Sequence, residues 1–190
     1  MFDADLGDCC ELNLESLPLQ LQDFENKWKQ YNPRKNVARW GLSITSLDGQ
    51  MTGEPDLDSL REYNRLNGTK YNESDFRTIT PLGEQFRSFS EKVDLGRSHI
   101  IKLGPGGYFP YHRDLDWNSF RVIYCIEDCQ PTNFVWITED KVLPLQNNKW
   151  YVLNTKKVHS TFSFNGCKFA VFNVIKSERS VRHIVRSLAI

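Results

Sequence analysis

His112 and Asp114 are separated by a single residue, and their side chains could hold a metal ion together. On a β-strand, residues i and i+2 point to the same face, so this imidazole and this carboxylate would lie side by side. Two imidazoles and one carboxylate on one face of an iron(II) ion leave its other coordination positions open for oxygen chemistry. Since His-x-Asp also occurs by chance, the tripeptide alone favours a surface histidine beside a solvated aspartate. The surrounding sequence has to decide between these interpretations.

A third ligand would have to come from a distant strand, and His159 is the best placed of the remaining histidines. It follows a strand-like run at 150–153 and the turn residue Asn154. His99 precedes a glycine-rich turn, and His183 lies in a charged C-terminal segment. We therefore expect His159 to complete a metal site with the His-x-Asp pair.

Asn165-Gly166 stands between two aromatic-rich runs, a pattern typical of a two-residue hairpin turn. In the register that this turn predicts, Ser163 pairs with Lys168, and Lys168 shares one face with His159. A lysine on an inward face needs an anionic partner, because burying an unpaired charge is costly. The distal carboxylate of a dicarboxylate bound to the metal would be such a partner. A flipped register, with Lys168 in solvent, is the alternative.

The elements that must position these residues change in character along the chain. The N-terminal half mixes helix and loop, with helices expected near 19–31, 56–67 and 82–93 and a strand at 37–47. After Arg97, short runs rich in Val, Ile, Phe and Tyr alternate with turn signals, which favours a sandwich or barrel over alternating β/α units. The expected strands are 98–103, 120–126, 133–138, 141–145, 150–153, 158–164 and 167–175.

The sequence therefore predicts a mainly β protein with N-terminal helices and an antiparallel double-sheet barrel of jelly-roll type. We expect one domain, with residues 1–95 as a helical and mixed support and residues 96–176 as the jelly-roll core that carries the metal site. Residues 177–190 are expected to form a C-terminal tail.

Composition excludes several classes of function. Lys+Arg and Asp+Glu are each 24, so the net charge is zero and there is no cationic excess for nucleic acid or an anionic membrane. No apolar run approaches the roughly 18 residues of a membrane span. The acidic segment 1–15 does not look like a secretory signal. Five cysteines at irregular spacing do not indicate a disulfide framework, so we expect a cytoplasmic location.

The segment 104–175 resembles the iron(II)/2-oxoglutarate-dependent oxygenase superfamily, and within it most closely the aspartyl/asparaginyl β-hydroxylase-like branch. It covers about seventy of the 190 residues, and the order and spacing of its motifs are more specific than any one of them. The matching features are Pro105-Gly106 ahead of His112-x-Asp114, Phe120-Arg121-Val-Ile, Trp150-Tyr-Val-Leu-Asn154, His159-Ser160, Asn165-Gly166, and a basic residue nine positions past the distal histidine.

The resemblance implies a double-stranded β-helix, a cupin-like barrel, with His112, Asp114 and His159 as the Fe(2+) ligands. It also implies a basic residue that binds the distal carboxylate of 2-oxoglutarate. The family usually has arginine after the distal histidine, whereas this chain has Lys168, a point charge without a bidentate fork. Arg121 matches another basic position of the family, so Lys168 and Arg121 remain alternatives for this role.

Three other residues have weaker signals. Asn133 is a candidate for a hydrogen bond to the co-substrate, Trp136 is interpreted as a core residue, and Arg39 is interpreted as an ordinary surface charge. The implied reaction consumes O2 and 2-oxoglutarate, releases succinate and CO2, and hydroxylates an amino-acid side chain in a small molecule or a peptide. The rival functions are a catalytically silent jelly-roll binding module and a cupin-type metal enzyme that does not use 2-oxoglutarate. Nothing in the sequence indicates an oligomeric state.

Overall fold

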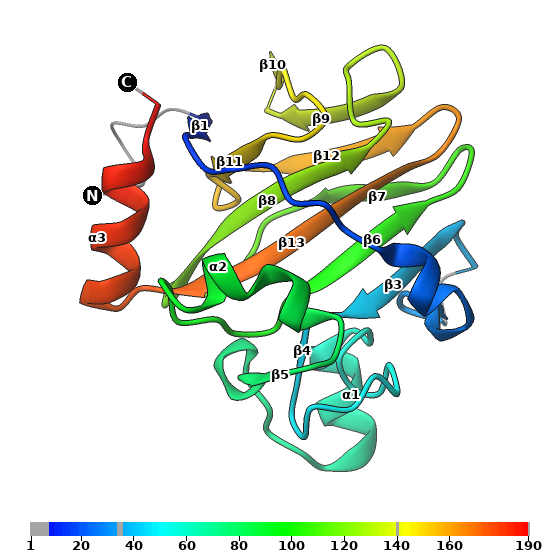
Figure 1. The fold of residues 1–190 in the computed structure, drawn as a ribbon. Helices are drawn as coiled ribbons and strands as arrows, with labels where there is room; N and C mark the ends of the chain where they lie inside the picture. The colour runs from blue at the N-terminus through cyan, green and yellow to red at the C-terminus, as the bar shows by residue number, and fades with distance from the viewer. Residues whose placement is uncertain (1–7, 34–35, 140, 190) are drawn as a thin grey trace.

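Two antiparallel sheets lie face to face in the computed structural model, which describes residues 8–33, 36–139 and 141–189 (Figure 1). Within these residues the larger sheet has seven strands and the smaller has four. In order across the larger sheet, the strands are β1 (Cys9–Leu12), β11 (Trp150–Leu153), β8 (Ser119–Glu127), β13 (Cys167–Ile175), β6 (His99–Leu103), β3 (Arg39–Ser43) and β2 (Lys29–Gln30). The smaller sheet has the order β10 (Lys141–Val142), β9 (Phe134–Thr138), β12 (His159–Ser163) and β7 (Tyr108–His112).

The strands from β6 to β13 cross repeatedly between the two sheets. β6, β8, β11 and β13 belong to the larger sheet, and β7, β9, β10 and β12 belong to the smaller one. This alternation makes a jelly-roll sandwich, so the predicted mainly β fold of jelly-roll type is confirmed. Each expected strand run has a counterpart, and β7 is an additional strand directly before the His-x-Asp pair.

The helices are short and pack mostly on the outer face of the larger sheet (Figure 1). They are η1 (Leu21–Lys27), α1 (Leu60–Asn67), η2 (Glu73–Asp75), η3 (Gly83–Phe86), α2 (Arg87–Ser90) and α3 (Glu178–Ser187), with a small ladder of β4 (Thr45–Ser46) and β5 (Thr78–Ile79). None of the helices in the described ranges is long and apolar enough to cross a membrane.

The C-terminal segment differs from the prediction of a tail, because most of it forms helix α3. The Ser177 side chain accepts a hydrogen bond from the backbone N–H of Ser180 and so caps the first turn. Ile184 is fully buried in the core beneath this helix. A cap followed by an apolar stripe is thus the local reason for the helix.

β13 divides the core between its two faces. Phe172 faces the helices, with its ring centroid 5.1 Å from those of Phe86 and Phe89. Phe169 and Val171 face the space between the two sheets. Both faces of this strand are therefore apolar.

The predicted hairpin register around Asn165-Gly166 is wrong. This turn carries the chain from one sheet to the other, and β13 pairs with β6 and β8 instead of β12. Phe169 takes the inward position, so Lys168, one residue earlier, points to the outer face of the larger sheet. A shift of one residue moves a side chain to the opposite face, and burial of the larger apolar side chain decides which one is inside.

Candidate metal centre

His112, Asp114 and His159 come together at the inner wall of the smaller sheet. His112 ends β7 and lies directly opposite His159 on the neighbouring strand β12. Their ring centroids are 4.3 Å apart. The possible ligand atoms of the three residues all lie within 4.8 Å of one another. The expected convergence of the three side chains is present.

A β-bulge on β7 turns His112 toward the cavity, while the His112 side chain stays 39% exposed. Thr161 lies opposite Phe109, and His159 lies opposite His112, so two steps along β12 correspond to three steps along β7. In a regular strand, residues three apart point to opposite faces, whereas the extra residue in a bulge re-aims the side chains that follow it. Phe109 and His112 therefore both line the interior.

Asp114 reaches the site from beyond the end of β7, so it does not share a strand face with His112 as the sequence predicted. Its backbone N–H donates a hydrogen bond to the carbonyl oxygen of Thr155, at 3.0 Å. Thr155 lies in the turn before β12. This contact fixes the carboxylate beside the two imidazoles.

Both imidazoles are oriented through their Nδ1 atoms. Nδ1 of His112 lies 2.7 Å from the carbonyl oxygen of Pro110, and Nδ1 of His159 lies 3.0 Å from that of Lys157. A carbonyl only accepts hydrogen bonds, so each Nδ1 carries the proton and each Nε2 keeps its lone pair for a metal. Burial lowers the pKa of His159 and so favours this neutral form. The His159 ring also stacks on Trp136, with 10° between the planes.

Arg121 on β8 holds the carboxylate in its charged form. Its Nε donates to Oδ2 of Asp114 at 2.8 Å, and Oδ1 lies 3.9 Å from Nε2 of His112. Burial, the largest single influence, would raise the pKa of Asp114, but the charge of Arg121, the two histidines and a hydrogen bond with Thr155 together outweigh it and lower this pKa to about 2. Asp114 therefore offers an ionised oxygen beside the two imidazoles at any ordinary pH.

A cavity of about 90 Å³ extends from these residues between the two sheets. Its wall includes buried polar atoms that have no hydrogen-bond partner in the described part of the chain: Nδ1 of His99, Nε1 of Trp136 and Oγ1 of Thr161. Unpaired buried polar atoms cost about 1–3 kcal/mol each. Such a wall suits a polar ligand, and Trp136, expected as a core residue, is also part of it.

Two of the three residues predicted to contact a co-substrate lie outside this cavity. Lys168 forms an ion pair with Glu127, with 2.6 Å between Nζ and Oε2, on the outer side of the larger sheet. Asn133 donates to the carbonyl oxygens of Asp128 and Gly166, and thereby fixes a turn. Arg121 lines the cavity.

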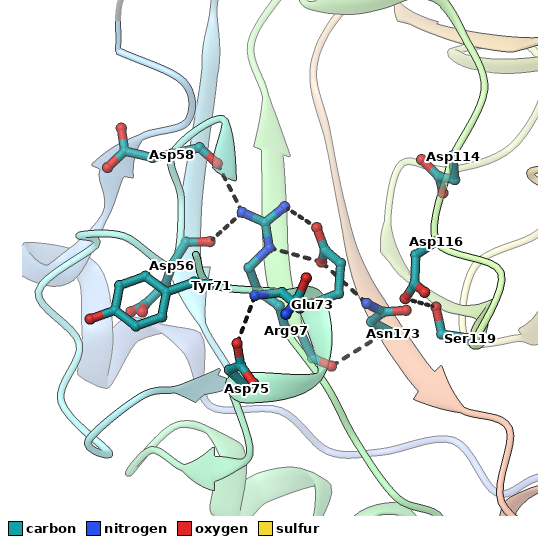
Figure 2. A network of polar contacts seen from close by, with 12 residues as sticks. Asp56, Asp58, Tyr71, Glu73, Asp75, Arg97, Asp114, Asp116, Ser119 and Asn173 are labelled. Carbon is teal, nitrogen blue, oxygen red and sulfur yellow. Dashed lines mark hydrogen bonds and ion pairs between the residues drawn. The ribbon is translucent and has the colours of Figure 1, made fainter. Parts of the chain in front are cut away.

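Arg97 is a cavity residue that sequence reasoning missed. Its guanidinium lies 2.8 Å from Oε1 of Glu73 and 2.8 Å from the carbonyl oxygen of Asp58 (Figure 2). Asn173 of β13 donates to the same Glu73 carboxylate. These contacts fasten η2 and the loop before α1 to the jelly roll at the edge of the cavity. A lone arginine between two charged segments carried no pattern by which the sequence could reveal this.

Asp56, in the same network, is expected to make stability depend on pH. It is 2% exposed and accepts a hydrogen bond from Ser43 Oγ at 2.8 Å. Burial raises its pKa to about 6. The folded state then holds this proton more tightly than the unfolded chain does, so stability should fall as pH rises from about 4 to 6 and stay lower above. Asp56→Asn should remove this cost and stabilise the protein at pH 7.5 by about 1–3 kcal/mol.

Urea unfolding of wild type and Asp56→Asn between pH 4 and 8 measures this difference. The exposed Asp23→Asn serves as the matched control and should change stability by less than about 0.5 kcal/mol. A stability difference between Asp56→Asn and wild type that does not grow between pH 4 and 6 would show that Asp56 is ionised without penalty.

Comparisons with known proteins give structural similarity only. No protein-family model and no curated protein matches the chain. Among solved structures, an oxidoreductase of the 2OG-Fe(II) oxygenase family from Burkholderia pseudomallei is 14% identical, with a TM-score of 0.40, over 75% of this chain and 70% of its own. A cupin-2 domain containing protein from Shewanella frigidimarina is 18% identical, with a TM-score of 0.34, over 41% of this chain and 69% of its own. A predicted oxalate decarboxylase from Thermotoga maritima is 17% identical, with a TM-score of 0.34, over 47% of this chain and 73% of its own.

Proposed function

We propose that this chain is a non-haem iron(II) oxygenase that takes 2-oxoglutarate as co-substrate and binds the metal through His112, Asp114 and His159. The observation that carries the proposal is the cluster itself: two imidazoles with free Nε2 atoms and one ionised carboxylate, all within 4.8 Å, on a cavity wall. The resemblance of the segment 104–175 to the 2-oxoglutarate-dependent oxygenases supports the same assignment.

The donor set fits iron(II) in an open site. Two histidines and one carboxylate are the ligand set of non-haem iron(II) oxygenases. A structural zinc site would ordinarily have four protein ligands. In the described ranges, no further His, Cys, Asp or Glu side chain joins the cluster. These three residues would therefore hold the iron at the cavity, whose wall carries the unpaired polar atoms.

Arg121 is the residue that we assign to a carboxylate of the co-substrate. It lines the cavity, and among the described residues only its Nε is hydrogen bonded, to Asp114. Its two remaining nitrogens are donors with fork geometry, which suits a carboxylate. The role proposed from the sequence for Lys168 passes to Arg121, because Lys168 lies outside the cavity.

The bound metal and co-substrate would supply the oxidation chemistry, and the protein would bind and orient them. When bound, iron and 2-oxoglutarate supply an oxygen-activating oxidation that releases succinate and CO2. Asp114 and the two imidazoles would hold the metal, Arg121 would orient the co-substrate, and Trp136 and Thr161 would offer hydrogen-bond donors from the cavity wall. The apolar interior behind them limits access of water. We propose that the substrate is an amino-acid side chain, free or in a peptide, that becomes hydroxylated.

Iron-loaded protein should slowly convert 2-oxoglutarate to succinate without any added substrate, because this uncoupled reaction needs only metal, oxygen and co-substrate. Succinate would be measured by chromatography after aerobic incubation, with iron content determined separately. His112→Ala should abolish the conversion, and Lys168→Ala should leave it within threefold of wild type. If fully iron-loaded wild type gave no succinate, a binding module or a metal enzyme without 2-oxoglutarate would replace the proposal.

A further inference from the structure

Arg39 is a buried arginine, in contrast to the surface charge expected from the sequence. It lies on β3 and is 1% exposed. Its Nη1 donates to the carbonyl oxygen of Tyr108 at 3.2 Å. The centre of the guanidinium lies 4.4 Å from the ring centroid of Phe109 and 5.7 Å from that of Tyr31. Both rings line the cavity of the candidate metal centre.

The charge of Arg39 has no carboxylate beside it in the described part of the chain. Two arginines line the cavity and each has such a partner: Arg97 pairs with Glu73, and Arg121 pairs with Asp114. Arg39 does not itself line the cavity but lies against Phe109, which does. The groups that act electrostatically on Arg39 are the phenols of Tyr31 and Tyr108. Aromatic faces stabilise a cation only partly, so its burial lacks a full compensation.

The unpaired atoms of Arg39 form a binding edge. Nε and Nη2 are both buried and have no hydrogen-bond partner among the described residues. These two nitrogens lie on one edge of the planar guanidinium, and their parallel N–H groups match the two oxygens of a carboxylate. An edge of this kind is what a bidentate carboxylate contact requires.

We propose that Arg39 is a receptor for a carboxylate of a ligand that occupies the cavity, at the wall formed by Tyr31 and Phe109. Phe109 is only half-buried, and rotation of its side chain would open the Nε/Nη2 edge to the cavity. The carboxylate belongs either to 2-oxoglutarate or to the organic substrate. The site deepens the proposed function, yet it requires no metal and can be tested without one.

A purely structural role is the competing explanation. Arg39 joins β3 of the larger sheet to β7 of the smaller sheet through its hydrogen bond to the carbonyl oxygen of Tyr108. Arg39→Lys keeps the positive charge and can still bond that carbonyl, but it lacks the bidentate edge. This variant therefore separates the two roles, and circular dichroism would verify that it is folded.

The direct test follows the arginine Nε–H signals of metal-free, 15N-labelled protein by NMR during titration with succinate, with neutral succinamide as the control. The Arg39 signal is the one that Arg39→Lys lacks. It should move in a saturable manner with succinate and stay in place with succinamide. Succinate affinity, measured by thermal shift, should fall at least tenfold in Arg39→Lys. An unmoved Arg39 signal, or equal succinate affinity in the two proteins, would overturn the proposal.

Two further titrations distinguish a co-substrate carboxylate from a substrate carboxylate. In zinc-loaded protein, movement of the Arg39 signal by 2-oxoglutarate itself would assign the site to the co-substrate. Movement by succinate in protein already saturated with 2-oxoglutarate would assign it to the substrate. Because the metal-free titration needs no iron, a failed iron assay would leave this result standing, and a failed titration would leave the iron proposal standing.

Discussion

His159→Ala is expected to lower the affinity for iron(II) by more than about a hundredfold, since even partners of metal ligands are worth 10–100-fold. His159 lies between His112 and Trp136 and provides one of the three donors of the cluster. Its Nδ1 is held by the carbonyl oxygen of Lys157, so Nε2 is already aimed at the site. Truncation removes that donor and leaves two ligands.

Anaerobic calorimetric titration with iron(II) measures this affinity, and cobalt(II) absorbance gives an independent reading. The matched control is His183→Ala, because His183 lies on α3 and outside the cavity. His159→Gln, which preserves much of the side-chain volume, guards against a folding defect. Wild-type affinity in folded His159→Ala would mean that the metal does not bind at this cluster.

Arg121→Gln is expected to weaken 2-oxoglutarate binding to the metal-saturated protein by about two to four orders of magnitude. Breaking one side of a buried ion pair costs roughly 3–5 kcal/mol, and this converts to that range of affinity. Arg121 is partly buried on β8, with 15% of its side chain exposed, and lines the cavity. A carboxylate bound there would lose the two guanidinium nitrogens that we assign to it.

The same substitution should also reduce metal affinity by about 10–100-fold, because Arg121 holds Asp114. The two effects are separated by titrating 2-oxoglutarate at saturating iron and following the charge-transfer absorbance of the complex. Lys168→Gln is the matched control and should stay within threefold of wild type, since its partner is Glu127 on the outer side. A weakened Lys168→Gln beside an unaffected Arg121→Gln would return the role to Lys168.

The strands could be predicted from the sequence because they form short apolar runs separated by turn residues. The runs that became β6, β8 and β13 are rich in branched and aromatic side chains, which fit a sheet that is covered on both faces. The same property hid the register of β13. With Phe169 on one face and Phe172 on the other, alternation could not reveal which face was inside.

The candidate ligands could be predicted because they depend on residue type and order. Their geometry could not, because Asp114 is placed by a backbone bond to Thr155 and His112 by a bulge. For a related reason Arg39 was wrongly interpreted as a surface charge and Arg97 was missed. A single arginine in a segment of mixed polarity makes no periodic sequence pattern. Each of these arginines is buried only because the first ninety residues pack against the sandwich.

β7 lies at the edge of the smaller sheet, and among the described strands it pairs with β12 alone. Edge strands open locally at a lower free energy than strands bonded on both sides. His112 stands at the end of β7 and Asp114 directly after it, while His159 belongs to the strand beside it. A metal held by all three would therefore join this edge strand to its neighbour, and β7 would gain protection against local opening by an amount set by metal affinity and concentration. Metal supply would then govern the lifetime of the folded edge as well as catalysis.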